Sequence, residues 1–175
     1  SDKMKEYGAL AGIQLAYSGI NGPNLYSKEV PMAVSAAPIR TFTNDPLQAR
    51  ALDKTDIRDL RRWFINAAKR SKEAGFDLIC LYGAHGFGIF QHFLSRATNH
   101  RTDEYGGSLE NRARFVNEVI SDMKDAVGDK MGITLRVSLD ETIGELGFSN
   151  SEVRDFIEMN RDLPDLWDLA QGTWE

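Results

Sequence analysis

The sequence predicts an α/β fold in which parallel strands alternate with helices, and three observations lead to this expectation. Four short runs are almost entirely apolar, which is typical of strands buried on both faces of a parallel sheet: 9–15, 76–82, 132–139 and 165–170. The segments between these runs contain amphipathic stretches with helical spacing. Every join from a helix to a strand is short, whereas every join from a strand to a helix is long. The predicted order is therefore β-α-β-α-β-α-β.

The first helix is expected over residues 56–74. Leu60 and Phe64 are one helical turn apart and would share its apolar face. Asp53 or Thr55 is the candidate N-cap, because a short oxygen-bearing side chain can accept from the free N–H groups of the first turn. Gly75 is expected to end the helix, since glycine readily adopts the left-handed backbone found at helix C-termini.

The second and third helices have clear start signals. The second begins at Ser108 and ends at Gly128. The third begins at Ser149, with Glu152 three residues further on, which is the spacing of a capping box.

The three long joins all leave the carboxyl ends of predicted strands: 16–54, 83–107 and 140–148. Loops of this length in a compact domain are usually functional, and α/β barrels and open α/β sheets both bind ligands at that end. None of the three contains the Gly-x-Gly-x-x-Gly turn expected of an open nucleotide-binding sheet, which favours a barrel. Since four strands cannot close a barrel of eight, residues 1–175 are expected to form about half of a (β/α)₈ TIM barrel.

Composition excludes several functional classes. Of the 175 residues, 42% are hydrophobic and 27% charged, as in globular proteins. The net charge is −5 and the basic residues are dispersed among acids, so no nucleic-acid partner is expected. No apolar run approaches the roughly 20 residues that span a bilayer, and the N-terminus lacks a signal-peptide pattern, so no membrane partner is expected. The single cysteine, Cys80, sits in an apolar run, which favours a buried thiol in a cytoplasmic protein.

Tyr82 and His85 are the candidate catalytic residues. They follow the second predicted strand, three positions apart, with small residues between them that leave room for a ligand. A phenol and an imidazole can each hydrogen-bond a substrate heteroatom and exchange a proton. The alternative is that both side chains cap the strand and bond to nearby backbone.

Arg136 and Gln14 are the candidate cofactor-binding residues. Each is a polar side chain in an otherwise apolar strand and therefore needs a partner. Arg136 would either pair with Asp140 or Glu141, or face a cofactor that becomes negatively charged when reduced, as a flavin does. Gln14 would either be a satisfied core amide or read the alternating N–H and C=O groups of a flat heterocycle.

The densest polar pattern runs from Asn99 to Arg112. Its two adjacent glycines, Gly106 and Gly107, allow a tight entry into the second helix, and Asn111 and Arg112 in the first turn can tie down the preceding loop. The preferred interpretation is loop bracing.

This pattern resembles the signature of the old yellow enzyme family of flavoproteins, and the resemblance spans essentially the whole chain. The matching stretches are 101–103, 105–112, Gln14-Leu15, Ala84-His85-Gly86 and Arg136. The resemblance implies that the chain holds strands 3 to 6 of the barrel and forms part of an FMN-binding domain. It places Gln14 against the pyrimidine edge of FMN and Arg136 near N1 and O2.

Within this family, residues 82–85 are similar to the trimethylamine, dimethylamine and histamine dehydrogenases and to dimethylglycine-type demethylases. Ordinary ene-reductases carry histidine at the positions of Tyr82 and Tyr17. The resemblance implies hydride transfer from the carbon next to the nitrogen of a small methylated amine to FMN. Tyr82 and His85 would then lie beside the substrate, with Tyr17 and Trp174 as substrate-binding residues, Trp174 through cation–π attraction.

Two alternatives remain open: an NAD(P)H-dependent ene-reductase, and an inactive barrel fragment. The expected partner is a small amine; the electron acceptor is not specified by the sequence, and the full-length protein could be a homo-oligomer. A 4Fe-4S cluster, which family members often have, would lie outside this chain. No metal site is predicted within it.

Overall fold

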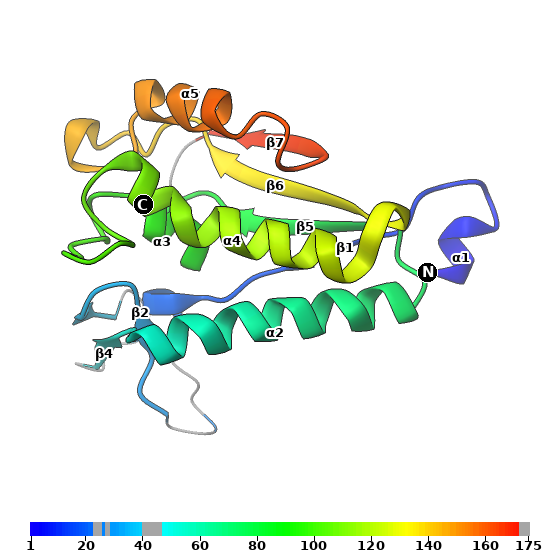
Figure 1. The fold of residues 1–175 in the computed structure, drawn as a ribbon, viewed down its shortest axis with the longest axis horizontal. Helices are drawn as coiled ribbons and strands as arrows, with labels where there is room; N and C mark the ends of the chain where they lie inside the picture. Colours follow the sequence, from blue (N-terminus) through cyan, green and yellow to red (C-terminus); the bar gives the residue numbers. More distant parts are fainter. Residues whose placement is uncertain (23–25, 27–28, 40–46, 172–175) are drawn as a thin grey trace.

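The computed structural model describes residues 1–22, 26, 29–39 and 47–171. Its centre is a parallel sheet of four strands in the order β1 (Gly12–Leu15), β5 (Leu78–Gly83), β6 (Gly132–Ser138) and β7 (Leu166–Ala170) (Figure 1). All four predicted strands are confirmed; β6 begins at the expected residue and the other three begin one to three residues later than expected. Strand order in space equals strand order in the chain, as it does in consecutive β/α units of a barrel.

Helices α2 (Lys54–Glu73), α4 (Leu109–Val127) and α5 (Asn150–Met159) join successive strands, and α2 and α4 run alongside the sheet (Figure 1). Their apolar faces pack on alternate strand residues that are fully buried: Ile79, Leu81, Ile133, Leu135 and Val137. The strand residues that alternate with these face away from the helices. The architecture is that of about half a (β/α)₈ barrel, with one face of the sheet covered by helices.

The predicted helix boundaries are accurate because they depend on local capping. Asp53, rather than Thr55, is the N-cap of α2, and it forms a reciprocal capping box with Asp56. Ser108 caps α4, which ends at Gly128 with φ of 63°.

The cap of α5 differs from a capping box. Ser149 accepts from the N–H of Glu152, as predicted. Among the described residues, however, the Glu152 carboxylate is engaged by Arg96 and Arg112 and not by the backbone of the cap. Arginines far away in sequence, one in the loop after α3 (Ile89–Leu94) and one in the first turn of α4, therefore compete successfully for a side chain that sequence spacing assigns to the helix start.

The long loops contain elements that the sequence did not predict. Residues 83–107 include the short buried helix α3 (Ile89–Leu94). Residues 16–54 include η1 (Gly19–Asn21) and a small sheet of β2 (Met32–Ala33), β4 (Gln48–Ala51) and β3 (Ala37–Pro38). The other short elements are α1 (Asp2–Lys5), η2 (Gly128–Lys130) and η3 (Gly144–Leu146). No helix in the described ranges is long and apolar enough to cross a membrane.

Candidate functional site

The side chains that face away from the helices form a polar row across the sheet. Strand register places Tyr82 beside Arg136, and Arg136 beside Asp168. One layer toward the amino ends of the strands, Gln14 lies beside Cys80. These positions alternate with buried apolar residues, so their side chains project from the open face of the sheet. The open face therefore carries a phenol, a guanidinium, a carboxylate, an amide and a thiol.

Tyr82 and His85, which the sequence places three positions apart at the end of a strand, are in direct contact. The phenol oxygen of Tyr82 lies 2.6 Å from Nδ1 of His85, which is a short hydrogen bond. His85 has φ of 61°, in the left-handed region that non-glycine residues rarely occupy. Backbone strain of this kind is found most often at functional sites.

Arg136 forms an internal ion pair, but not with either partner considered from the sequence. Its Nε donates to Oδ2 of Asp168 at 2.7 Å, on the neighbouring strand, and not to Asp140 or Glu141. Hydrogen bonding to Asp168 raises the pKa of Arg136, so the guanidinium stays charged. Its side chain is 36% exposed and, within the described part of the chain, its terminal nitrogens donate to no residue. A fixed cation on the open face can therefore bind a further anionic group.

Gln14 is exposed on β1, on the face of the sheet that carries no helices. Cys80, the thiol beside it, is half-buried, and burial raises its pKa, so the thiol form is favoured. The amide of Gln14 is thus available for a ligand on the same face as Arg136.

Tyr17 is placed differently from Tyr82 and His85. Its ring packs against Trp63 of α2, with ring centroids 6.4 Å apart. Burial raises the pKa of its phenol, while the backbone of Met32 and the charge of Arg50 oppose the shift. No described contact joins the Tyr17 ring to the Tyr82–His85 pair. Trp174, the other predicted substrate-binding residue, lies outside the described residues.

The signature region braces the loops, as the sequence analysis preferred. The Arg101 guanidinium forms a two-pronged contact with Asp103 and also donates to the carbonyls of Val34 and Leu52 beside the small sheet. Gly106 lies so close to the Arg101 carbonyl that any side chain would clash with it. Arg101 thereby ties two of the long loops together at the carboxyl end of the sheet.

This brace makes a testable contribution to acid stability. Hydrogen bonding to Arg101 holds the pKa of the Asp103 carboxyl below its ordinary value. A carboxyl whose pKa is lower in the folded than in the unfolded protein stabilises the fold. This stabilisation is complete above the pKa in the unfolded chain, about 3.9, and is lost as the pH falls through the pKa in the folded protein. Between about pH 5 and pH 2 the full-length wild type should therefore lose more thermal stability than the Asp103→Asn variant. Melting curves across this pH range check it, with exposed Asp155→Asn as the control; parallel pH profiles for wild type and Asp103→Asn would contradict it.

A buried polar network behind His85 was missed by sequence reasoning. It comprises Gln91 of α3, Ser138 at the end of β6 and Glu141 in the following loop, all nearly inaccessible to solvent. These residues are separated in sequence by up to 50 positions, so no spacing reveals them. The one available signal was Gln91 within the apolar segment of α3.

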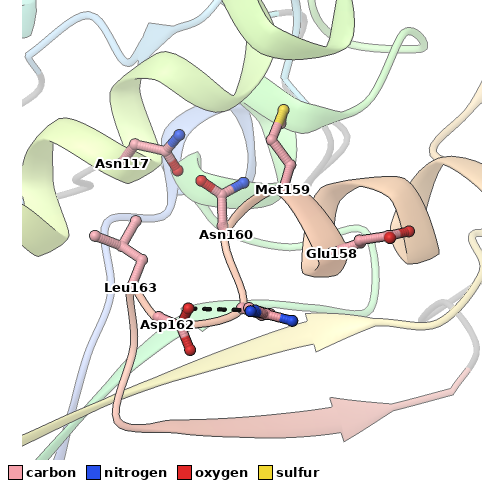
Figure 2. A pocket seen from close by; sticks show the side chains of 7 residues that line it. Asn117, Glu158, Met159, Asn160, Asp162 and Leu163 are labelled. Carbon is pink, nitrogen blue, oxygen red and sulfur yellow. Dashed lines mark hydrogen bonds and ion pairs between the residues drawn. The ribbon is translucent and has the colours of Figure 1, made fainter.

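A surface hollow lies elsewhere, between α4 and the join from α5 to β7 (Figure 2). Asn117, Asn160, Arg161 and Asp162 are among its lining residues. This join enters the amino end of β7, whereas Tyr82 and His85 lie at the carboxyl end of β5. None of the predicted site residues lines the hollow, so it is not the candidate active site.

The chain has close relatives among known proteins. A model of the NADH:flavin oxidoreductase / NADH oxidase family matches residues 1–174. The structure of histamine dehydrogenase from Rhizobium sp. 4-9 is similar, with 82% identity and a TM-score of 0.96, over 99% of this chain and 25% of that one.

Two curated relatives have different activities in their names. NADPH dehydrogenase of Clostridium acetobutylicum is 38% identical over 97% of this chain and 48% of the relative. Dimethylamine dehydrogenase of Hyphomicrobium sp. is 33% identical over 98% of this chain and 24% of the relative. The chain thus spans less than half the length of either curated relative.

Proposed function

This chain belongs to the NADH:flavin oxidoreductase / NADH oxidase family, and from that membership we propose that it supplies part of an FMN site at which a small amine is oxidised. The observation that carries the proposal is the Tyr82–His85 hydrogen bond on the strand next to Arg136. It puts a proton-exchanging pair beside a fixed cation on one open face.

The donors on this face fit the edge of a flavin ring. Gln14 offers an amide with donor and acceptor capacity, and Arg136 offers a cation already oriented by Asp168. We propose that Gln14 contacts the pyrimidine edge and Arg136 the region of N1 and O2, where reduction places negative charge. When bound, FMN supplies the two-electron acceptor. The residues that would hold its phosphate are not assigned in this chain.

The Tyr82–His85 pair suits amine oxidation because the substrate must be neutral at nitrogen before hydride can leave. The pair accepts the ammonium proton, and the adjacent carbon of the neutral amine then loses a hydride to become a C=N carbon. Two electrons and one proton leave the carbon together, and the nitrogen lone pair forms the new bond. We propose Tyr82 and His85 as the catalytic residues, with Tyr17 and Trp174 as substrate contacts.

The amine substrate is proposed from two lines of support. The sequence suggests a methylated amine such as dimethylamine, trimethylamine or dimethylglycine. The 82% identity to a histamine dehydrogenase adds histamine, a primary amine, as the first compound to test. An NAD(P)H-dependent ene-reductase is the second candidate, supported by the NADPH dehydrogenase relative.

Anaerobic flavin bleaching of the full-length holoprotein tests the proposal. One arm adds four amines separately: histamine, dimethylamine, trimethylamine and dimethylglycine. The other arm adds NADPH, with and without an enone. Bleaching by at least one amine is expected. Bleaching by NADPH followed by reoxidation with the enone, with no response to any amine, would replace the proposal with ene reduction. The isolated chain of 175 residues is expected to show neither reaction.

Arg136 is expected to raise the reduction potential of the bound flavin. Replacing it with glutamine should lower the midpoint potential by on the order of 30 mV, equivalent to about 1.4 kcal/mol for a two-electron couple. Spectroelectrochemical titration of the full-length protein measures this.

Because Arg136→Gln also leaves Asp168 unpaired, the double variant Arg136→Gln/Asp168→Asn is the matched comparison. An unchanged potential in both variants would show that the cation does not face the flavin.

A further inference from the structure

Glu141 carries a buried carboxylate that the proposed chemistry does not use. It is 5% exposed and lies in the loop that follows β6. It accepts from Nε2 of Gln91 at 2.9 Å, from Oγ of Ser95 at 2.5 Å and from the N–H of Phe148 at 2.5 Å. No lysine or arginine in the described ranges forms an ion pair with it. Burying a carboxylate among neutral donors is costly, so this group needs a reason beyond packing.

The network continues from Glu141 to the backbone of His85. Oε1 of Gln91 accepts from the N–H of Gly86 at 3.1 Å and from Oγ of Ser138 at 3.4 Å. Oγ of Ser138 in turn accepts from the N–H of His85 at 2.6 Å. A buried carboxylate is thereby connected to the two residues that bond the backbone N–H groups of His85 and Gly86.

The backbone N–H groups at the two ends of this network determine which group donates and which accepts in the hydrogen bonds of Gln91. The N–H groups of Gly86 and Phe148 can only donate. Gln91 must therefore turn its oxygen toward Gly86 and its NH₂ toward Glu141, which must accept. The hydroxyl of Ser138 then donates to Gln91 and keeps a lone pair for the N–H of His85.

The segment that this network holds has a strained backbone. His85, Gly86 and Gly88 all have positive φ, of 61°, 70° and 89°. Only the first is not glycine, and a left-handed non-glycine residue persists when surrounding contacts over-determine it. The two bonds from Ser138 and Gln91 supply such contacts on consecutive N–H groups.

We propose that Glu141 is a positioning residue: by fixing the amide orientation of Gln91, it holds His85 in the left-handed conformation that brings Nδ1 to the Tyr82 hydroxyl. The expected effect on the rate of flavin bleaching rests on the proposed function, whereas the expected effect on the conformation of His85 does not. Gly147 leaves space for the Glu141 carboxylate, because a Cβ at that position would lie 2.5 Å from Oε2 of Glu141.

A residue exchange tests the proposal in the full-length holoprotein. In Glu141→Gln the new side-chain NH₂ faces the NH₂ of Gln91. Two donors then meet without an acceptor, so one of the two amides must turn away and lose a hydrogen bond. The double variant Glu141→Gln/Gln91→Glu restores every donor and acceptor, because the carboxylate now faces Gly86 and Ser138 while the amide donates to it. Surface Glu158→Gln is the matched control for the same chemical change.

Two measurements are made on each variant: the rate of amine-driven flavin bleaching, and the ¹⁵N chemical shift of His85 Nδ1, assigned through His85→Asn. The single variant is expected to slow bleaching between about tenfold and about 100-fold and to move the shift, as misplacement of a catalytic group does. The exchange variant is expected to recover both.

Each other outcome is decisive. A slow single variant that the exchange does not rescue, or a folded single variant with unchanged rate and shift, overturns the proposal. If wild type is not bleached by any amine, the proposed function fails while the ¹⁵N shift still decides the role of Glu141. Should Glu141→Gln not fold, Ser138→Ala removes the acceptor of the His85 N–H directly, and an unmoved Nδ1 shift in that variant overturns the proposal.

Discussion

Replacing Arg112 with methionine is expected to lower the free energy of unfolding of the full-length protein by about 3 kcal/mol. Arg112 is 1% exposed, and its guanidinium reaches the carbonyls of Gly107 and Leu94 and the carboxylate of Glu152. Methionine fills part of the volume but leaves the buried carbonyl of Leu94 without this donor and removes an ion-pair partner of Glu152, which are the costly steps. Urea unfolding followed by circular dichroism measures the change.

Two comparisons make this prediction specific. Arg112→Lys keeps the charge but cannot span three acceptors at once, so an intermediate loss is expected. Arg154→Met makes the same chemical change at an exposed position of α5 and should alter stability by less than about 0.5 kcal/mol. Equal stability of Arg112→Met and wild type would show that the signature does not brace the fold.

Removing the hydroxyl of Tyr82 is expected to slow amine-driven flavin reduction by about 100-fold. Tyr82→Phe keeps the ring on the open face but removes the partner of His85 Nδ1 at 2.6 Å. Rapid mixing of the oxidised full-length variant with saturating amine measures the rate of the reduction step, separately from later electron transfer.

The matched control is Tyr7→Phe, which removes a hydroxyl from a residue that is 88% exposed near the N-terminus. A pH profile adds a second readout, because loss of a group that exchanges protons should remove one limb of the wild-type profile. Wild-type rates with an unchanged profile in Tyr82→Phe would leave the tyrosine without a catalytic role.

The fold was predictable wherever the determinants are local. The four strands are apolar runs, and Ser108 and Gly128 bound α4 through contacts within a few residues. Helix α3 was not predicted because it is six residues long and its N-cap, Gly88, has no side chain to signal a start. The small sheet was missed because two of its strands have only two residues each.

The site was predictable to the extent that its members follow one another in sequence. The spacing of Tyr82 and His85 placed both residues at the carboxyl end of one strand, but the hydrogen bond between them was not predicted. An internal ion pair of Arg136 was considered, with Asp140 and Glu141 as example partners. Register across two strands, and not proximity in sequence, brings Asp168 beside it instead. The network through Glu141 depends on three separate elements meeting, which no single stretch encodes.

The agreement between strand order in space and in the chain also bears on how the protein assembles. Each strand pairs with the one made immediately before it in the main sheet, so β5 can dock on β1, β6 on β5 and β7 on β6. Mainly sequential contacts of this kind shorten the loops that must close and favour rapid folding. During synthesis each completed unit can therefore serve as the template for the next, without waiting for the C-terminus of the protein to leave the ribosome.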